Sequence, residues 1–231
     1  MEIAGLQKLT LIDYPGKLAC TVFLAGCNFR CPWCYSKELV LPEEIKKQPK
    51  ISEKEFFNFL KKRKGLLEGV VLCGGEPTIF KNLPNFAKKI KKLGFSVKLD
   101  TNGSNPEMIK EMINKHLIDY VAMDVKLPKE EYSKVFFDKT KVEDINESIN
   151  ILKKGKVGFE FRTTVVPTIH KKGDILKIVH WIRPASKYFL QNFRAEKTID
   201  PGFEKIKPYP REFLLEIIKT IAPFFETCEV R

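Results

Sequence analysis

The hydrophobic residues of this chain fall into short runs that alternate with longer amphipathic stretches. Several of the short runs are apolar on both faces, as in the strands of a parallel sheet that helices cover on its outer side. We therefore expect six strands, over residues 18–26, 69–75, 96–103, 120–126, 158–167 and 187–193.

The stretches between these runs carry apolar residues at helical spacing, with recognisable start and stop signals. Ser52 and Glu55 form a capping-box pattern ahead of one apolar stripe. Pro106 is placed to begin a second helix, and Gly155 to end a third. Pro210 precedes the last helical stripe. Each pair of expected strands is thus separated by an expected helix.

Strands that alternate with helices predict right-handed βαβ crossovers. Both a partial barrel and a doubly wound open sheet satisfy this pattern. The chain has 231 residues, which falls short of the roughly 250 residues of a complete eight-fold barrel. Six units fit an incomplete barrel better, so we expect an α/β fold, a partial (β/α)6 TIM-like barrel, as a single domain over residues 1–231.

Composition adds limits on the class of protein. The chain is 43% hydrophobic and 30% charged, as in ordinary globular proteins. No apolar run approaches the roughly 20 residues of a membrane span, and the N-terminal segment lacks the features of a secretory signal. We therefore expect a cytoplasmic protein. The net charge of +12 suits an acidic partner, a nucleic acid or an anionic cofactor, or else only solvated helix faces.

Polar and glycine-rich clusters follow all six expected strands. In parallel α/β folds the functional residues lie at the carboxyl ends of the strands, which meet at one mouth. Any one cluster is weak support, because a short turn has a similar composition. Their shared position predicts a functional site built from residues 27–34, 74–78, 100–103, 123–126, 162–167 and 190–193.

Three cysteines, Cys27, Cys31 and Cys34, lie within eight residues after the first expected strand. A structural zinc site needs a fourth Cys or His nearby, and iron–sulfur clusters also normally use four cysteines. Neither Cys73 nor any histidine follows closely in the sequence. A cluster held by three thiolates leaves one iron open to an external ligand. We expect the remaining cysteines to be small buried residues: Cys20, Cys73 and Cys228.

This C-x-x-x-C-x-x-C pattern, followed by Gly-Gly-Glu-Pro after the second strand, resembles the radical S-adenosylmethionine (SAM) superfamily. The opening "LIDYPGKLACTVFLAGCNFRCPWC" is similar to its activating-enzyme branch, which includes pyruvate formate-lyase activating enzyme and anaerobic ribonucleoside-triphosphate reductase activating proteins. The resemblance implies a [4Fe–4S] cluster on Cys27, Cys31 and Cys34, with SAM on the fourth iron. It further implies reductive cleavage of SAM to a 5′-deoxyadenosyl radical, which generates a glycyl radical on a partner such as anaerobic ribonucleotide reductase.

The resemblance also assigns roles to residues at the other strand ends. Gly74, Gly75, Glu76 and Pro77 would bind the amino group of SAM, mainly through backbone carbonyls. Asp124 and Lys126 match a D-x-K element beside SAM and the target, and form the expected catalytic pair.

Further expected cofactor-binding residues come from three strands. Arg162 would hold the carboxylate of SAM or the main chain of a target. Asp100 and Thr101, together with Asp124, resemble a monovalent-cation site next to that carboxylate, and the adjacent Asn102 is a further expected cofactor-binding residue. The ribose-contacting histidine of the related activating enzyme is missing, so Gln191 or the neighbouring Asn192 would replace it.

Two other functions compete with the activating enzyme. One is a radical SAM enzyme that modifies a small molecule or nucleoside, as a deazapurine synthase does, and the core motifs serve both enzymes. The other is a zinc-bearing nucleic-acid-binding module, which explains neither the Gly-Gly-Glu-Pro segment nor the barrel pattern. Only a loop and one helix follow the last expected strand, so the mouth lacks a lid. An open mouth favours a peptide target, with flavodoxin or ferredoxin as electron donor.

Overall fold

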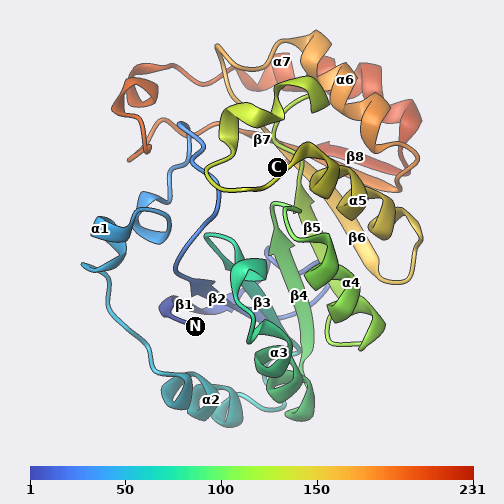
Figure 1. The fold of residues 1–231 in the computed structure, drawn as a ribbon. Coiled ribbons are helices and arrows are strands. Elements are labelled where there is room, and N and C mark those ends of the chain that lie inside the picture. Colours follow the sequence, from blue (N-terminus) through green and yellow to red (C-terminus); the bar gives the residue numbers. More distant parts are fainter.

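The computed structural model describes residues 1–231 and contains one curved sheet of eight strands, ordered in space as they are in sequence (Figure 1). The two end strands each pair with one neighbour, so the barrel stays open between β1 and β8. The strands are β1 (Ile3–Thr10), β2 (Ala19–Leu24), β3 (Gly69–Gly74), β4 (Ser96–Thr101), β5 (Tyr120–Asp124), β6 (Gly158–Val165), β7 (Lys187–Asn192) and β8 (Thr227–Val230).

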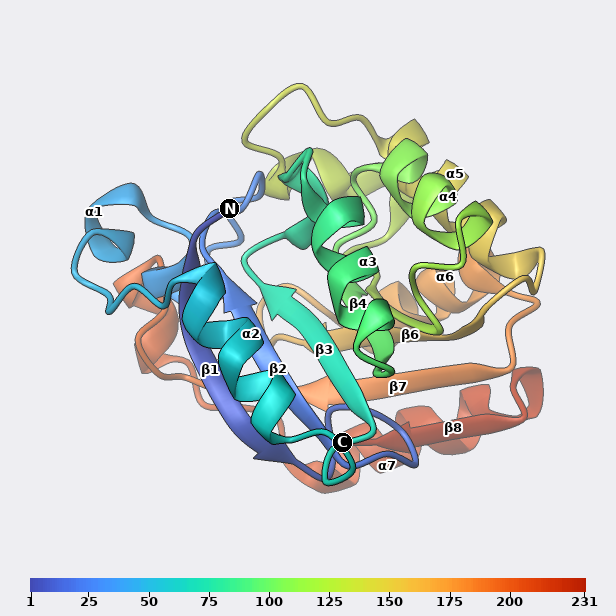
Figure 2. The same cartoon turned by 90° about the horizontal axis from the view of Figure 1, so that it is seen from below.

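From β2 on, helices lie between successive strands and cover the outer face of the sheet (Figures 1 and 2). The α-helices are α1 (Pro42–Ile45), α2 (Glu53–Lys62), α3 (Leu83–Lys92), α4 (Pro106–Asn114), α5 (Val142–Lys153), α6 (Lys172–Ile182) and α7 (Arg211–Ile221). Short 3-10 helices occur at Lys37–Leu39, Pro77–Ile79, Lys129–Val135, Pro201–Lys205 and Ala222–Phe224. No helix combines the length and the apolar character needed to cross a membrane.

The six expected strands all form, as β2 to β7, and each pairs in parallel with the next. The expected helix signals also hold. The side chain of Ser52 accepts from the Glu55 backbone, which completes a capping box at the start of α2. Pro106 is the first residue of α4, and α7 begins directly after Pro210. The partial (β/α)6 barrel is therefore confirmed as the centre of the fold.

Two strands were not expected from the sequence. β1 runs antiparallel to β2, and β8 extends the parallel sheet beyond β7. β1 contains Gly5 and the exposed side chains of Gln7 and Lys8, and its register with β2 shifts at two places. β8 has four residues and no fully buried side chain. Edge strands of this kind lack the apolar pattern that reveals buried ones.

The main hydrophobic core lies between the sheet and the helices. Alternate strand residues such as Leu72, Leu99 and Phe161 are fully buried there against helix residues such as Phe86 and Ile90. Burying each such side chain contributes about 1.5–3 kcal/mol relative to leaving it exposed.

The opposite face of β4 and β6, which faces the inside of the barrel, is polar instead. On β4, Lys98 and Asp100 alternate with the apolar Val97 and Leu99. On β6, Glu160 and Arg162 alternate with Phe161. The inside of the barrel therefore holds charged groups, where the complete barrels of this class are filled by branched apolar residues.

Candidate functional site

A cavity of about 1080 Å³ occupies the inside of the barrel and opens at the carboxyl ends of the parallel strands. The structure brings together at its wall nearly all of the residues expected from the sequence. Pro77 does not reach the wall, because it is buried at the start of a 3-10 helix. The expected residues that line the cavity are Cys27, Cys31, Cys34, Gly74, Gly75, Glu76, Asp100, Asn102, Asp124, Lys126, Arg162 and Gln191.

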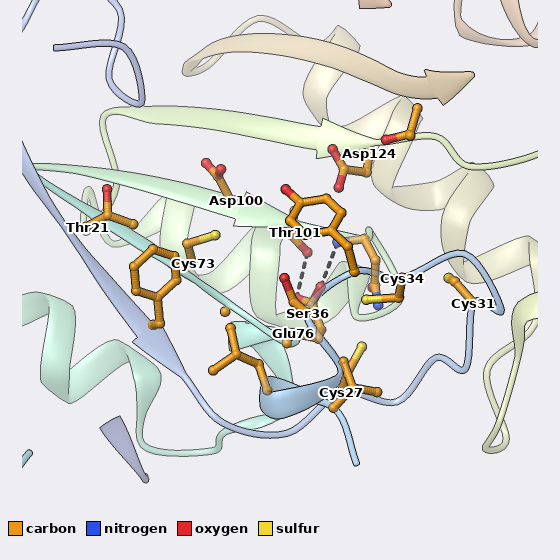
Figure 3. A pocket seen from close by; sticks show the side chains of 18 of the residues that line it. Thr21, Cys27, Cys31, Cys34, Ser36, Cys73, Glu76, Asp100, Thr101 and Asp124 are labelled. Atoms are coloured by element: carbon orange, nitrogen blue, oxygen red, sulfur yellow. Dashed lines mark hydrogen bonds between the residues drawn. The ribbon is translucent and has the colours of Figure 1, made fainter. Parts of the chain in front are cut away.

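The three-cysteine loop leaves the end of β2 and is fixed by backbone contacts on both sides. The N–H of Gly26 donates to the carbonyl oxygen of Leu39 (2.7 Å), and that of Arg30 donates to the carbonyl oxygen of Val135 (3.0 Å). The guanidinium of Arg30 also donates to the carbonyl oxygen of Cys27 (2.8 Å). Figure 3 shows the three thiols on this loop, beside Glu76 and Thr101.

The thiols of Cys27, Cys31 and Cys34 are free and largely buried. Burial raises the pKa of Cys27 and of Cys31 to about 12, although the positive charge of Lys126 acts in the opposite direction. Burial also raises the pKa of Cys34. Thiols in such surroundings lose their protons when a metal binds them, because the thiolate is the metal ligand.

The donor set fits an iron–sulfur cluster better than a zinc ion. It consists of three thiols, and no set of three His, Cys, Asp or Glu side chains is gathered closely enough to hold one ion. The thiolates of a cubane cluster bind different iron atoms, so they lie farther apart than the ligands of a single ion. Thiolates bind both zinc and iron–sulfur clusters, so the spacing of the three thiols is what favours the cluster.

The Gly-Gly-Glu segment packs directly against the backbone that enters the cysteine loop. A Cβ on Gly74 would lie 2.1 Å from the carbonyl oxygen of Leu24, and one on Gly75 would lie 2.0 Å from that of Gly26. Gly74 also has φ of +134°, which side chains disfavour. The backbone N–H of Gly75 donates to the Leu24 carbonyl (2.9 Å). The two glycines therefore permit contact between the end of β3 and the start of the cysteine loop.

Glu76 is fully buried, and protein donors already occupy both of its carboxylate oxygens. Oε1 accepts from the backbone N–H of Thr78 (3.0 Å), from its hydroxyl (2.6 Å) and from the hydroxyl of Thr101 (2.8 Å). Oε2 accepts from the backbone N–H of Asn102 (2.6 Å). Burial raises the pKa of Glu76, and these hydrogen bonds act against that shift. The side chain braces the ends of β3 and β4.

Asn102 connects the end of β4 to the cysteine loop. Its side-chain amide donates to Asn28 Oδ1 (3.0 Å), and its own Oδ1 accepts from the N–H of Ser104 (2.9 Å). Asn28 lies directly after Cys27 in the sequence. The side chain of Asn102 therefore orients the loop.

Five charged side chains on three neighbouring strands form one chain of ion pairs. Lys98 Nζ contacts Asp100 Oδ1. Asp100 Oδ2 lies 3.0 Å from Arg162 Nη1, and Arg162 Nε lies 2.8 Å from Asp124 Oδ1. Asp124 Oδ2 lies 3.2 Å from Lys126 Nζ. Arg162 therefore already has two carboxylate partners within the protein.

These pairs keep Asp124, Lys126 and Arg162 ionised. Burial by itself would raise the pKa of Asp124, but the charges of Arg162 and Lys126 outweigh it and hold the pKa at about 2. The pKa values of Arg162 and Lys126 are raised by their carboxylate partners, against the effect of burial. With three cations and two anions, the chain carries a net positive charge, and all of its members except Lys98 line the cavity.

Lys98 and His170 contact residues of the site but were not singled out from the sequence as site residues. His170 was considered only as a distant partner for the cysteines. It is fully buried, and its ring packs edge-on against Trp33 of the cysteine loop, with ring centres 6.3 Å apart. Its Nε2 lies 2.8 Å from the carbonyl oxygen of Lys126. The strand alternation could have identified Lys98, because it shares the inner face with Asp100, whereas nothing local identified His170.

Asn192, at the end of β7, carries an unpaired acceptor. Its Nδ2 donates to the carbonyl oxygen of Tyr209 (2.8 Å), which fixes the orientation of the amide. Its Oδ1 is buried and has no hydrogen-bond partner, and the residue lines the cavity together with Gln191. A buried acceptor without a partner costs about 1–3 kcal/mol.

The remaining cysteines differ from one another. Cys20 is fully buried, as expected. Cys73 is partly exposed and lines the cavity, and Cys228 is partly exposed on the edge strand β8, so the expectation of burial was wrong for both. Cys73 faces inward because it follows the alternation of β3, in which Leu72 faces the helices.

Comparison with protein families matches residues 21–182 to the Radical SAM superfamily. A protein of Methanocaldococcus jannaschii with the provisional name of glycyl-radical enzyme activating enzyme is 36% identical over 228 residues, which is 95% of this chain and 91% of that protein. The 7-carboxy-7-deazaguanine synthase of Thermococcus kodakarensis is 31% identical over 128 residues, which is 48% of this chain and 50% of that enzyme.

Solved structures of Streptococcus suis SuiB share the fold. The one bound to S-adenosylmethionine superposes with a TM-score of 0.62 over 91% of this chain and 51% of SuiB. The one bound to the precursor peptide SuiA superposes with a TM-score of 0.64 over 90% of this chain and 47% of SuiB. Both are 14% identical to this chain, and the chain spans about half the length of SuiB.

Proposed function

This chain belongs to the Radical SAM superfamily, and on that premise we propose that it is an activating enzyme that generates a glycyl radical on a partner protein. The observation that carries the proposal is the similarity to the Methanocaldococcus jannaschii relative, which extends over nearly the full length of both chains. We treat residues 1–231 as one radical SAM domain. Anaerobic ribonucleotide reductase is the class of partner that the sequence resemblance suggests.

In this proposal Cys27, Cys31 and Cys34 hold a [4Fe–4S] cluster, and their shared loop fixes its orientation. When bound and reduced, such a cluster supplies one electron to the sulfonium of SAM, which releases methionine and a 5′-deoxyadenosyl radical that takes a hydrogen atom from the target. The electron would come from flavodoxin or ferredoxin. The backbone bonds of Gly26 and Arg30 keep the loop rigid.

The remaining residues bind and orient SAM. The net positive charge of the ion-pair chain suits the carboxylate of SAM, with Arg162 and Lys126 facing the cavity. The amino group needs acceptors, which the backbone carbonyls of Gly74 and Gly75 supply. Asn192 Oδ1, which has no partner within the protein, accepts from a ribose hydroxyl or the adenine amine. Gln191 lies beside it on the cavity wall.

The position of the cavity supports a protein target. Its volume of about 1080 Å³ is large enough for the cluster and SAM. The cavity also extends to the gap between β1 and β8, because Gln7 of β1 and Arg231 directly after β8 line it. An extended loop of a large partner fits such an opening. The net charge of +12 favours encounter with an acidic partner surface.

A second candidate function is the modification of a nucleoside or related small molecule. It is favoured by the partial similarity to 7-carboxy-7-deazaguanine synthase, which covers about half of each chain. The two functions share the cluster and the SAM site, so only the target distinguishes them.

The test is to incubate the reduced, cluster-loaded protein with SAM and a glycyl-radical enzyme from the same organism, and then record the EPR spectrum. We expect a doublet glycyl signal that disappears when the target glycine is replaced by Ala. A matched control uses the Cys27→Ala variant, which should give no signal. If no partner protein yields a radical while a free nucleoside or purine metabolite stimulates release of 5′-deoxyadenosine, the second candidate is correct.

A further inference from the structure

The sequence resemblance suggests a monovalent cation beside SAM, held by Asp100 and Asp124. Alkali cations are hard ions that bind oxygen ligands, and carboxylates supply the negative charge of such sites. The charges on the inner face of the barrel therefore show whether these two carboxylates are available to an ion.

They are not available, because each of the four carboxylate oxygens already contacts a cationic nitrogen. The two oxygens of Asp100 contact Lys98 and Arg162, the latter at 3.0 Å. The two oxygens of Asp124 contact Arg162 at 2.8 Å and Lys126 at 3.2 Å. An added cation would have to displace one of these nitrogens or share its oxygen.

Lys98 is the cation of this group that is most deeply buried. It precedes Asp100 by two residues on β4, so both side chains point to the same face of the sheet. Its side chain is 1% exposed, and Asp100 is the only hydrogen-bond acceptor of its ammonium group. Burying a lone ammonium costs several kcal/mol, so the buried charge of this lysine depends on its contact with Asp100.

We propose that the tethered ammonium group of Lys98, together with the Arg162 guanidinium, takes the place of a monovalent cation, so that this protein binds SAM without Na⁺ or K⁺. An ammonium group carries the same charge as K⁺ and is of similar size. Because it is attached to β4, it stays in place at any salt composition. The inference rests on the proposed function only in taking SAM as the ligand.

The first experiment uses the protein without cluster or SAM, so that it is independent of the radical reaction. Its melting temperature is measured in NaCl, in KCl and in tetramethylammonium chloride at equal ionic strength. We expect the wild-type protein to melt at the same temperature in all three salts. A specific stabilisation of the wild type by Na⁺ or K⁺ would overturn the proposal.

The Lys98→Met variant removes the ammonium group and keeps a side chain of similar length. Asp100 Oδ1 is then free, so we expect Na⁺ or K⁺ to raise the melting temperature above that in tetramethylammonium chloride. The matched control is Lys81→Met, at an exposed lysine, which should show no cation preference. A Lys98→Met variant that folds and is equally stable in all three salts would contradict the proposal.

If Lys98→Met does not fold, a second measurement on the wild type tests whether SAM binding depends on Na⁺ or K⁺. The affinity of the cluster-loaded protein for SAM is determined by calorimetry in the same three salts. We expect dissociation constants that agree within about twofold, whereas a tenfold weakening in tetramethylammonium chloride, equal to about 1.4 kcal/mol, would overturn the proposal. Failure of the glycyl-radical test would leave both results unaffected, so the two proposals can fail separately.

Discussion

His170 holds Lys126 in place through its main chain: His170 Nε2 donates to the Lys126 carbonyl oxygen over 2.8 Å. The tautomer follows from the second ring nitrogen. Nδ1 accepts a hydrogen bond from the backbone N–H of Val166 (3.0 Å), so it carries no proton and Nε2 does. The same ring packs against Trp33. His170 is therefore a positioning residue that connects the cysteine loop to Lys126, although it lies 44 residues further along the chain.

Replacing His170 by Ala should weaken SAM binding by displacing Lys126. The buried carbonyl of Lys126 and the N–H of Val166 would lose their partners, which costs about 1–3 kcal/mol of folding stability for each group. We expect a raised KM for SAM with a smaller change in kcat, together with a lower melting temperature. His170→Gln, which can still accept and donate, should recover part of both losses.

The matched control for this change is His180→Ala, at an exposed histidine on α6. It should leave KM and melting temperature unchanged. Wild-type KM and stability in His170→Ala would show that the contact with Lys126 has no positioning role.

The same histidine predicts a dependence of stability on pH. Burial lowers the pKa of His170 below its ordinary value of 6.5. The unfolded chain therefore takes up a proton at a higher pH than the folded protein does. The stabilisation from neutral His170 is complete above about pH 6.5 and is lost as the pH falls toward the lower folded-state pKa. Urea unfolding of the cofactor-free protein from pH 8 to pH 5 should show a steeper decline for the wild type than for His170→Gln. Parallel curves would contradict this.

Replacing Glu76 by Ala should destabilise the fold. The carboxylate accepts four hydrogen bonds from buried donors of Thr78, Thr101 and Asn102. Removing a buried acceptor with several donors should cost about 3 kcal/mol or more, measured as the free energy of unfolding. Glu147→Ala, at an exposed position of α5, should change it by less than about 0.5 kcal/mol. Weakened SAM binding in Glu76→Ala at unchanged stability would show that the carboxylate contacts SAM and does not act as a brace.

Replacing any one of Cys27, Cys31 and Cys34 by Ala should reduce the iron and sulfide content. The anaerobically reconstituted wild type should hold about four iron and four sulfide per chain, measured by chemical analysis and by the visible absorption of the cluster. Cys228→Ala, at the edge strand, serves as the control and should keep the full content. Stoichiometric zinc without sulfide in an anaerobic wild-type preparation would rule out the cluster.

The sequence alone determined the six central strands, the helices between them and the place where the polar clusters meet. These elements could be predicted because buried strands have a recognisable local sequence: strands such as Val70–Leu72 are apolar on both sides. The carboxyl ends of parallel strands must also lie at one edge of the sheet. The two edge strands have no such apolar pattern. β1 exposes Gln7 and Lys8, and β8 is too short to show a pattern.

Only the tertiary structure decided which polar groups contact one another. Asp124 and Arg162 are paired because β5 and β6 align in the register that places them opposite each other. A shift of that register by one residue would turn one of the two side chains to the helical face. Glu76 contacts Thr101, and His170 contacts Lys126, across separations of 25 and 44 residues. Local patterns show which face a side chain occupies, but its partners depend on how distant segments pack, and that packing is a property of the whole fold.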